Sequence, residues 1–439
     1  MRFFSIRMSP PQLLVLLFLS LTVIGTILLK LPIATTTPIS WINACFTTVS
    51  AFTVTGLGVV DTGTTFTLFG QLVILTLIQV GGLGIMSFAV LIFIVLGKKI
   101  SWKNRILLQQ ALNQTNVGGI IRLAKALLIY SIGVELLAMV FLSLEWVPEY
   151  GWKKGLYASF FHSISAFNNA GFSIWPDSLI RHAASPLVNL VITSVIILGG
   201  IGFTVVVDIW TKRRFSRLSL HSKLMIIFTF IFNLVGMLAI YGLERNNINT
   251  LGKLNEGEKI LAAYFQSVTT RTAGFDTVDI ANLTEPTLLV IILFMFIGAG
   301  SASTGGGIKL TTFLVIVLGV IKFLKEQDTI VIFRKAIEDK AIVKAIAITL
   351  ISIMFSFVAI LTLSITEKAP LMQIVFEVFS AFGTVGLTIG LTTALTFTGK
   401  CIIIFMMFFG KLGPLTLAFT LARKNVVKIK YPSEDILTG

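Results

Sequence analysis

One short stretch, Ala51-Phe-Thr-Val-Thr-Gly-Leu-Gly58, lies between two long apolar segments and resembles neither of them. The chain repeats it three more times, at Ser165-Ala-Phe-Asn-Asn-Ala-Gly-Phe172, Thr269-Thr-Arg-Thr-Ala-Gly-Phe275 and Ser380-Ala-Phe-Gly-Thr-Val-Gly-Leu387. The central glycines, Gly56, Gly171, Gly274 and Gly386, are separated by 115, 103 and 112 residues. An aromatic residue precedes each glycine by ten positions: Phe46, Phe161, Tyr264 and Phe376. Four similar loops predict four similar units around one axis.

The composition is that of an integral membrane protein. Apolar residues make up 55% of the 439 residues, charged residues make up 13%, and the mean hydropathy is +0.93. Apolar runs of about 20 residues indicate membrane-spanning helices rather than barrel strands. The formal net charge of +15 gathers in short loops, a pattern of membrane topology rather than of nucleic-acid binding. Cys45 and Cys401 give neither a disulfide framework nor a metal-binding spacing.

The chain divides into four tandem units, each with an outward helix, a short half-helix, a glycine loop and a returning helix. We expect the units at residues 1–110, 111–218, 219–335 and 336–439, with half-helices at 40–52, 153–167, 257–270 and 369–382. The predicted fold is an all-α integral membrane protein with eight transmembrane helices, four re-entrant half-helices and pseudo-fourfold symmetry around one pore. Because Lys and Arg cluster between the units, the positive-inside rule places both termini in the cytoplasm.

The four loops suggest a cation-binding chemistry. Irregular backbone at membrane depth is tolerated only where it is buried or lines a water-filled path. Converging loops would present rings of carbonyl oxygens, which can replace the hydration shell of a potassium ion, and glycine lets the backbone approach closely. We therefore predict an ion selectivity filter that binds K⁺ at the backbone carbonyls of Val54, Thr55, Gly56, Asn169, Ala170, Gly171, Thr272, Ala273, Gly274, Thr384, Val385 and Gly386.

These features carry a family resemblance. Over nearly its whole length the chain resembles the membrane subunit of bacterial Ktr potassium-uptake systems, of the KtrB/KtrD type, in the Trk/Ktr/HKT superfamily. The marks are the four filter glycines, the Thr-Arg-Thr-Ala-Gly of the third loop, and a glycine-rich break in the returning helix of the third unit. The resemblance implies an eight-helix pore, a homodimer and a cytosolic ring of nucleotide-binding regulatory subunits of the KtrA/KtrC type. This chain has no dinucleotide-binding fingerprint, so we expect no cofactor within it and nucleotide only on the partner.

The glycine-rich break is the predicted gate. Its residues are poor formers of helix interior: Gly298, Ala299, Gly300, Ser301, Ala302, Ser303, Thr304, Gly305, Gly306 and Gly307. We expect a broken helix whose loop lies under the filter and blocks the pore at rest, with a flexible packing kink as the alternative. The resemblance implies that the regulatory ring moves this loop. The similar runs at residues 79–85 and 197–203 we attribute to close helix packing.

Lys411 lies about midway along the last helix, where an unpaired charge is costly, and we assign it to the gate. Two readings stay open. Lys411 pairs with an acid such as Asp208 or Glu135, or it projects into the cavity below the filter, beside the 298–307 loop, and slows passing cations. Family members commonly carry arginine at this place, so the lysine keeps the charge but loses the rigid fork.

Other charged residues lie close to the loops. Arg271 precedes Gly274 by three residues, and we expect it to brace the filter by pairing with Glu377 or Asp276. Four aspartates follow the loops on the outer side, where they either concentrate cations or are ordinary solvated charges: Asp61, Asp177, Asp276 and Asp279.

The predicted function is potassium uptake across the cell membrane through one filter, gated by an intramembrane loop under control of a cytosolic regulatory subunit. The alternative is a sodium-coupled or sodium-conducting transporter with alternating access, which four units of the same orientation disfavour. Some relatives with serine at the first filter glycine pass sodium, so Gly56 favours potassium as the transported ion, with Na⁺ as the alternative. A membrane enzyme would need a convergent catalytic set, and the histidines are scattered: His162, His182 and His221.

Overall fold

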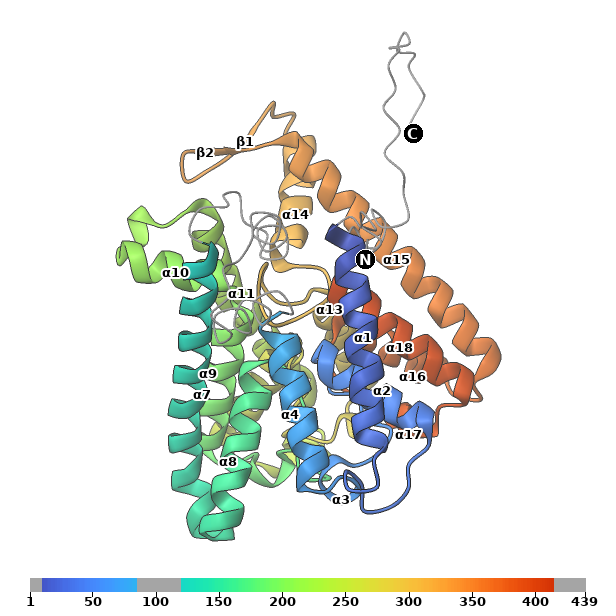
Figure 1. The fold of residues 1–439 in the computed structure, drawn as a ribbon. Coiled ribbons are helices and arrows are strands. Elements are labelled where there is room, and N and C mark those ends of the chain that lie inside the picture. The colour runs from blue at the N-terminus through green and yellow to red at the C-terminus, as the bar shows by residue number, and fades with distance from the viewer. Residues whose placement is uncertain (1–9, 85–119, 414–439) are drawn as a thin grey trace, which may run out of the picture.

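The computed structural model describes residues 10–84 and 120–413, and its regular secondary structure is helical apart from one short hairpin (Figure 1). The first unit contains α1 (Pro10–Lys30), α2 (Trp41–Thr53), α3 (Thr62–Thr65) and α4 (Leu68–Gly82). The second contains α7 (Ile120–Tyr150), α8 (Trp152–Phe167), η1 (Ile180–His182), α9 (Pro186–Gly200), α10 (Phe203–Lys212) and η2 (Phe215–Arg217). The third contains α11 (Leu220–Glu244), η3 (Leu251–Lys253), α12 (Glu256–Thr269), η4 (Ile280–Asn282), α13 (Glu285–Phe296) and α14 (Leu310–Leu324). The fourth contains α15 (Asp339–Thr366), α16 (Leu371–Gly383), α17 (Leu391–Ala394) and α18 (Phe397–Leu412).

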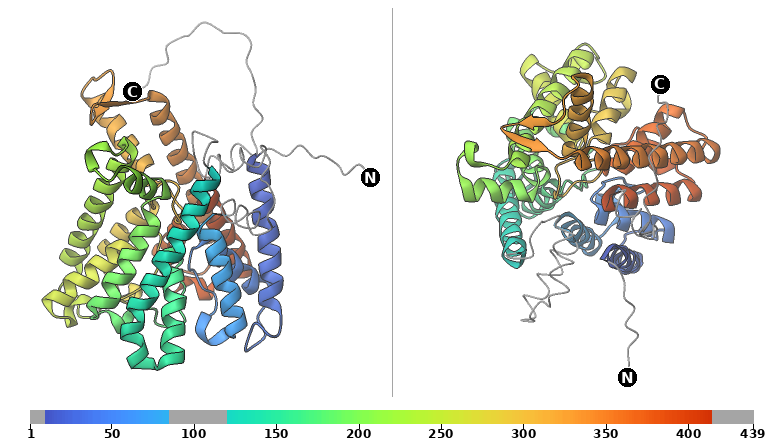
Figure 2. Two further views of the ribbon diagram at one scale, coloured as in Figure 1. Left: turned by 60° about the vertical axis from the view of Figure 1, so that its left-hand side comes forward. Right: turned by 90° about the horizontal axis from the view of Figure 1, so that it is seen from above.

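The four units follow one another around a common centre, as the view from above shows (Figure 2, right). The returning helix of each unit packs against the half-helix of the next, in the pairs α4 with α8, α9 with α12, and α13 with α16. The last returning helix, α18, packs against α2 of the first unit and closes the ring. The all-α, four-unit architecture predicted from the repeats is therefore confirmed.

The half-helices α2, α8, α12 and α16 lie within three residues of their predicted bounds at both ends. Local sequence explains their starts and stops. Ser40 caps α2 by accepting from the backbone N–H of Asn43, and Asn255 with Glu258 forms a capping box on α12. At the other end, Val54 and Thr384 adopt left-handed backbone that ends α2 and α16. The chain therefore leaves these two half-helices abruptly and enters a loop.

The returning helices begin with a repeated polar clamp. In the second, third and fourth units an acid of the outward helix accepts from the hydroxyl at the N-cap: Glu145 from Ser185, Glu244 from Thr284, and Glu367 from Thr396. In the first unit Thr67 caps α4 and donates instead to the carbonyl of Ile33 at 2.6 Å. The clamp ties the outer ends of the two long helices together in all four units.

The eight predicted spans correspond to α1, α4, α7, α9, α11, α13, α15 and α18. Among the described residues, Lys125–Tyr150, Leu220–Glu244 and Asp339–Thr366 are each long and apolar enough to cross a membrane alone. The pair α9 and α10 makes a fourth candidate, but it bends by 92° between the two helices. Attributing the 197–203 run to helix packing alone therefore missed a second broken helix, which turns at Gly202 with φ +105°.

The segment between α14 and α15 contains a small hairpin. Strand β1 (Ile330–Ile332) pairs antiparallel with β2 (Lys335–Ile337), with Ile330 opposite Ile337. Phe333 and Arg334 form its two-residue turn with positive φ. The predicted unit boundary at 335/336 falls inside β2, and the boundary at 110/111 lies outside the described residues.

Candidate functional site

The four glycines form a closed ring of backbone contacts. A Cβ atom added to Gly56 would lie 3.2 Å from Cα of Gly171, and one added to Gly171 would lie 3.0 Å from Cα of Gly274. A Cβ added to Gly274 would lie 3.2 Å from Cα of Gly386, and one added to Gly386 would lie 3.0 Å from Cα of Gly56. Each added Cβ would also collide with the carbonyl oxygen of the residue before the next glycine. No side chain fits at these positions, so the repeated glycine is a steric requirement of the ring.

Backbone conformation is repeated as closely as the contacts. The four glycines have φ of +91°, +67°, +76° and +95° in chain order. Two residues before each glycine, a non-glycine residue also has positive φ: Val54 (54°), Asn169 (56°), Thr272 (74°) and Thr384 (50°). Left-handed backbone is uncommon for non-glycine residues and persists only where the surroundings enforce it. Four occurrences at one register show that the loops share one conformation.

The buried aromatic of the third half-helix lies one residue closer to its glycine than in the other three units. In the first, second and fourth units the fully buried aromatic ten residues before the glycine is Phe46, Phe161 or Phe376. In the third unit the fully buried aromatic is Phe265, nine residues before Gly274, whereas Tyr264 is only partly buried. Tyr264 therefore has the repeated sequence position, whereas Phe265 has the buried place.

Close helix contact holds the half-helices beneath their loops. A Cβ added to a glycine of a returning helix would strike the last phenylalanine carbonyl of that unit's own half-helix, in the pairs Gly81 with Phe52, Gly199 with Phe167, and Gly410 with Phe382. These glycines belong to the small-residue runs of the returning helices, so the packing role predicted for the runs at 79–85 and 197–203 holds for this part of them.

Polar side chains of two half-helices form hydrogen bonds with residues that follow the glycine loops. Glu377 is fully buried and accepts from the hydroxyls of Thr388 and Thr392, which follow the fourth loop. At the matching position of the second unit, His162 contacts the hydroxyl of Ser173 at 3.0 Å. Glu377 thus binds hydroxyls of its own unit instead of the predicted partner Arg271.

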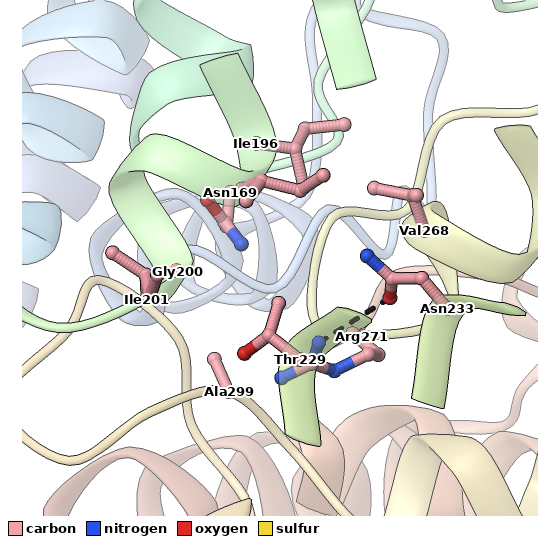
Figure 3. Close-up of a pocket in the computed structure, with 10 residues that line it drawn as sticks. Asn169, Ile196, Gly200, Ile201, Thr229, Asn233, Val268, Arg271 and Ala299 are labelled. Carbon is pink, nitrogen blue, oxygen red and sulfur yellow. Dashed lines mark hydrogen bonds between the residues drawn. The ribbon is translucent and has the colours of Figure 1, made fainter. Parts of the chain in front are cut away.

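Arg271 does not pair with Glu377 or Asp276, contrary to the prediction. Its guanidinium is buried and donates to Oδ1 of Asn233 on α11 at 3.3 Å, while its Nε has no hydrogen-bond partner among residues 10–84 and 120–413 (Figure 3). The side chain thus points toward α11 rather than toward α16. A cavity of about 10 Å³, large enough for about one water, separates Arg271 from Asn169 and Ala299.

The 298–307 loop lies directly against the glycine loops. The backbone N–H of Gly306 donates to Oγ1 of Thr384 at 2.9 Å. A Cβ added to Gly305 would collide with Oγ1 of Thr272, and one added to Gly306 would collide with the side chain of Thr384. The break predicted in the third unit is confirmed in position, and its glycines are what allows the loop to approach so closely.

Two lysines donate to carbonyls of this loop. Lys411 donates from Nζ to Thr304 O, which decides between its two open readings in favour of a position beside the loop. Lys309 donates from Nζ to Gly305 O at 2.6 Å and repels Lys411 electrostatically. Sequence reasoning missed Lys309. A signal for it was its place at the N-cap of α14, because a positive charge there is unfavourable for the helix dipole and so needs a partner of its own.

Comparison with known proteins identifies the family. The profile of TrkH, described as "Cation transport protein", matches residues 7–429. This chain belongs to the TrkH family of cation transport proteins. It is 55% identical to the Ktr system potassium uptake protein B of Bacillus subtilis, over 99% of this chain and 98% of that protein. It is 43% identical to the protein of the same name from Vibrio alginolyticus, over 98% and 95% of the two chains.

Two further matches extend the comparison. The potassium/sodium uptake protein NtpJ of Enterococcus hirae is 38% identical over 99% of this chain and 98% of its own length. The crystal structure of the potassium transporter TrkH from Vibrio parahaemolyticus matches with a TM-score of 0.74 at 20% identity, covering 96% of this chain and 87% of that one. The fold is thus shared with a transport family, and the chain is a multi-pass membrane protein that transports cations rather than an enzyme.

In this TrkH-family chain the two acids considered as partners of Lys411 have other, local partners. Glu135 accepts from Gln79 at 2.9 Å and, at 3.4 Å, from Asn168 beside the second glycine loop. Asp208 pairs with Lys212 at 2.7 Å. Neither acid contacts Lys411, which completes the case against the pairing reading.

The outer aspartates take part in local structure. Asp61 caps α3, Asp279 caps η4, and Asp177 pairs with Arg181 at 2.6 Å. Asp276 accepts no hydrogen bond at its buried Oδ1 within the described residues. A role of these side chains in attracting cations stays a prediction.

Proposed function

We propose that this protein takes up potassium through a pore whose selectivity filter is the ring of four glycine loops. The observation that carries the proposal is the closed sequence of contacts from Gly56 through Gly171 and Gly274 to Gly386 and back. Such a ring brings four backbones around one point, and backbone carbonyls can replace the hydration shell of a cation. The names of the Bacillus and Vibrio relatives supply the ion.

The 298–307 loop is the proposed gate, with Lys309 and Lys411 as the residues that hold it. Its contacts with Thr272 and Thr384 support a position on the inner side of the filter. Two lysine charges near the path would raise the barrier to a passing cation. At an effective dielectric near 20, unit charges at 4 Å repel by about 4 kcal/mol. Displacing the loop would move the carbonyls to which Lys309 and Lys411 donate, and it would lower that barrier.

The proposed assembly is a homodimer bound to a cytosolic ring of nucleotide-binding regulatory subunits. It is supported by the sequence resemblance and by the word "system" in the names of the relatives. The ring would bind the nucleotide and supply the free energy that displaces the loop. We place both chain termini, which lie outside the described residues, on the same cytoplasmic side.

Tracer flux into proteoliposomes that contain the purified protein tests the function. We expect rubidium uptake that external potassium inhibits and sodium does not. Equal inhibition by sodium would favour the sodium-conducting alternative, which the name of the Enterococcus relative also keeps in view. Absence of any cation flux from a protein that remains folded, with and without its regulatory partner, would contradict the pore.

A further inference from the structure

The second broken helix turns α10 out of the direction of the bundle. Helix α9 runs along the long axis of the molecule, and α10 crosses its end at 92° to α9 (Figure 1). The turn depends on Gly202, because φ is +105° there and an added Cβ would lie 2.6 Å from Ser301 O. This end of the molecule also carries the start of α1 and the β1–β2 hairpin, and the basic loops mark it as the inner side (Figure 1). Helix α10 therefore lies near the inner membrane surface.

The turn is hydrogen-bonded directly to the 298–307 loop. The backbone N–H of Phe203, the first residue of α10, donates to Ala302 O at 2.8 Å. In the opposite direction, Gly300 N–H donates to Gly200 O at 2.8 Å. These bonds join main chain to main chain, so a movement of α10 changes the position of the loop without any intermediary.

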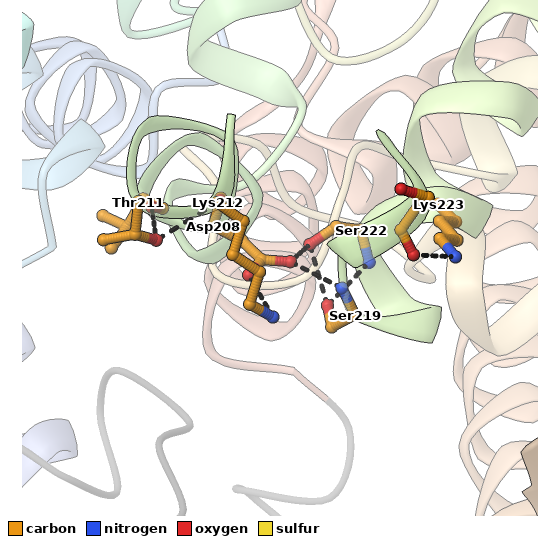
Figure 4. Close-up of polar contacts among 8 residues, drawn as sticks. Asp208, Thr211, Lys212, Ser219, Ser222 and Lys223 are labelled. Atoms are coloured by element: carbon orange, nitrogen blue, oxygen red, sulfur yellow. Dashed lines mark hydrogen bonds and ion pairs between the residues drawn. The ribbon is translucent and has the colours of Figure 1, made fainter. Parts of the chain in front are cut away.

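The other end of α10 is fixed to α11. One carboxylate oxygen of Asp208 accepts from Ser219 N–H at 2.8 Å and from the Ser222 hydroxyl at 2.7 Å, and the other pairs with Lys212 (Figure 4). Ser219 is the N-cap of α11, so this carboxylate also sits where the helix dipole favours negative charge. The segment from α10 to η2 is thus a braced arm rather than a loose loop.

The arm exposes aromatic side chains next to arginine side chains that are unpaired among the described residues. Trp210 is 78% exposed and Phe215 is 48% exposed. Between and beside them, Arg213, Arg214 and Arg217 are exposed, and none has a side-chain partner in the described part of the chain. A tryptophan at an interface with adjacent arginines is the composition of a surface that lies on lipid headgroups.

We propose that the α10–η2 arm binds anionic phospholipid at the inner membrane surface and thereby holds the 298–307 loop in place. The aromatic side chains would enter the headgroup region while the arginines contact lipid phosphates. Each basic residue near an anionic surface strengthens attachment about fivefold. A cytosolic protein is the competing occupant, but the place of the arm near the inner membrane surface and its exposed Trp210 and Phe215 favour lipid. The lipid contact stands without the gate, whereas its effect on flux rests on the proposed gating role of the loop.

The test uses the full-length protein in vesicles of phosphatidylcholine, with and without phosphatidylglycerol. Bromine attached to the acyl chains of one lipid at a time quenches nearby tryptophan, and the Trp210→Phe variant isolates the Trp210 signal. We expect brominated phosphatidylglycerol to quench Trp210 more strongly than brominated phosphatidylcholine. Replacing Arg213, Arg214 and Arg217 by glutamine should abolish that preference. The matched control, Lys153→Gln with Lys154→Gln, removes exposed charges at the other end of the molecule and should preserve it.

Rubidium flux in the same vesicles tests the coupling. Phosphatidylglycerol should reduce flux without the regulatory partner, and the triple glutamine variant should restore it. Equal quenching of the isolated Trp210 signal by both lipids would overturn the proposal, whether or not the triple glutamine variant folds. Protection of Trp210 from both brominated lipids by the cytosolic partner would overturn it in favour of a protein occupant. A lipid preference without an effect on flux would retain the lipid contact and overturn the coupling to the loop.

Discussion

Lys411 on α18 donates a hydrogen bond to the main-chain carbonyl of Thr304 in the 298–307 loop. The last helix thereby holds the broken helix of the third unit, and a fixed positive charge stands beside the proposed path. Lys309 makes the same kind of contact with the neighbouring carbonyl of Gly305.

The Lys411→Gln variant should raise partner-free potassium flux while the protein stays folded. A hydrogen bond from a charged group contributes about 1.5–3 kcal/mol, so its loss should increase the open population by about tenfold or more. Flux into proteoliposomes measures the effect. Lys400→Gln is the matched control, because Lys400 lies on the same helix and donates to Asn43 away from the loop. Reduced flux at normal expression would contradict a restraining role.

Each of the four filter Gly→Ser variants should lose most of its potassium uptake. A Cβ meets the backbone of the next loop, and left-handed backbone strains a non-glycine residue by about 1–3 kcal/mol, so uptake should fall about tenfold or more. Complementation of an uptake-deficient bacterium at low potassium provides the measurement. Gly133→Ser and Gly242→Ser are controls, since an added Cβ meets nothing within 4 Å at either place. Normal growth of all four filter variants would refute the ring.

Deleting residues 299–306 should raise flux in the absence of the regulatory partner. The deletion removes the contacts with Thr272 and Thr384 and both lysine acceptors. Thermal unfolding of the purified variant establishes that the remaining helices fold. Unchanged low flux from a folded deletion variant would place the gate elsewhere.

Arg271 should be coupled energetically to Asn233 and not to Glu377. A double-mutant cycle with Arg271→Met and Asn233→Leu, followed by thermal unfolding, should give a coupling of about 0.5–3 kcal/mol. The cycle that combines Arg271→Met with Glu377→Gln should give none, because Glu377 is bound to Thr388 and Thr392. A large second coupling would restore the pairing expected from the sequence.

Repetition explains which features could be predicted from the sequence. The four glycines, the half-helices and the break in the third unit each recur or interrupt a regular pattern, so position within the repeat located them. The partner of Arg271 could not be found in this way, because only the third loop carries an arginine and its side chain turns toward Asn233 on α11. The bend at Gly202 was hidden because the same run of small residues also serves helix packing at Gly199. Lys309 was missed because its acceptor, Gly305 O, exists only once the loop has folded back.

The most direct test of the ring is to locate the transported ion. Crystals of the protein grown in rubidium and measured at the rubidium absorption edge show where the cation binds. The predicted result is anomalous density on the axis between Gly56, Gly171, Gly274 and Gly386, which disappears when sodium replaces rubidium. Rubidium density elsewhere in the membrane region, with none inside the ring of glycines, would contradict the filter.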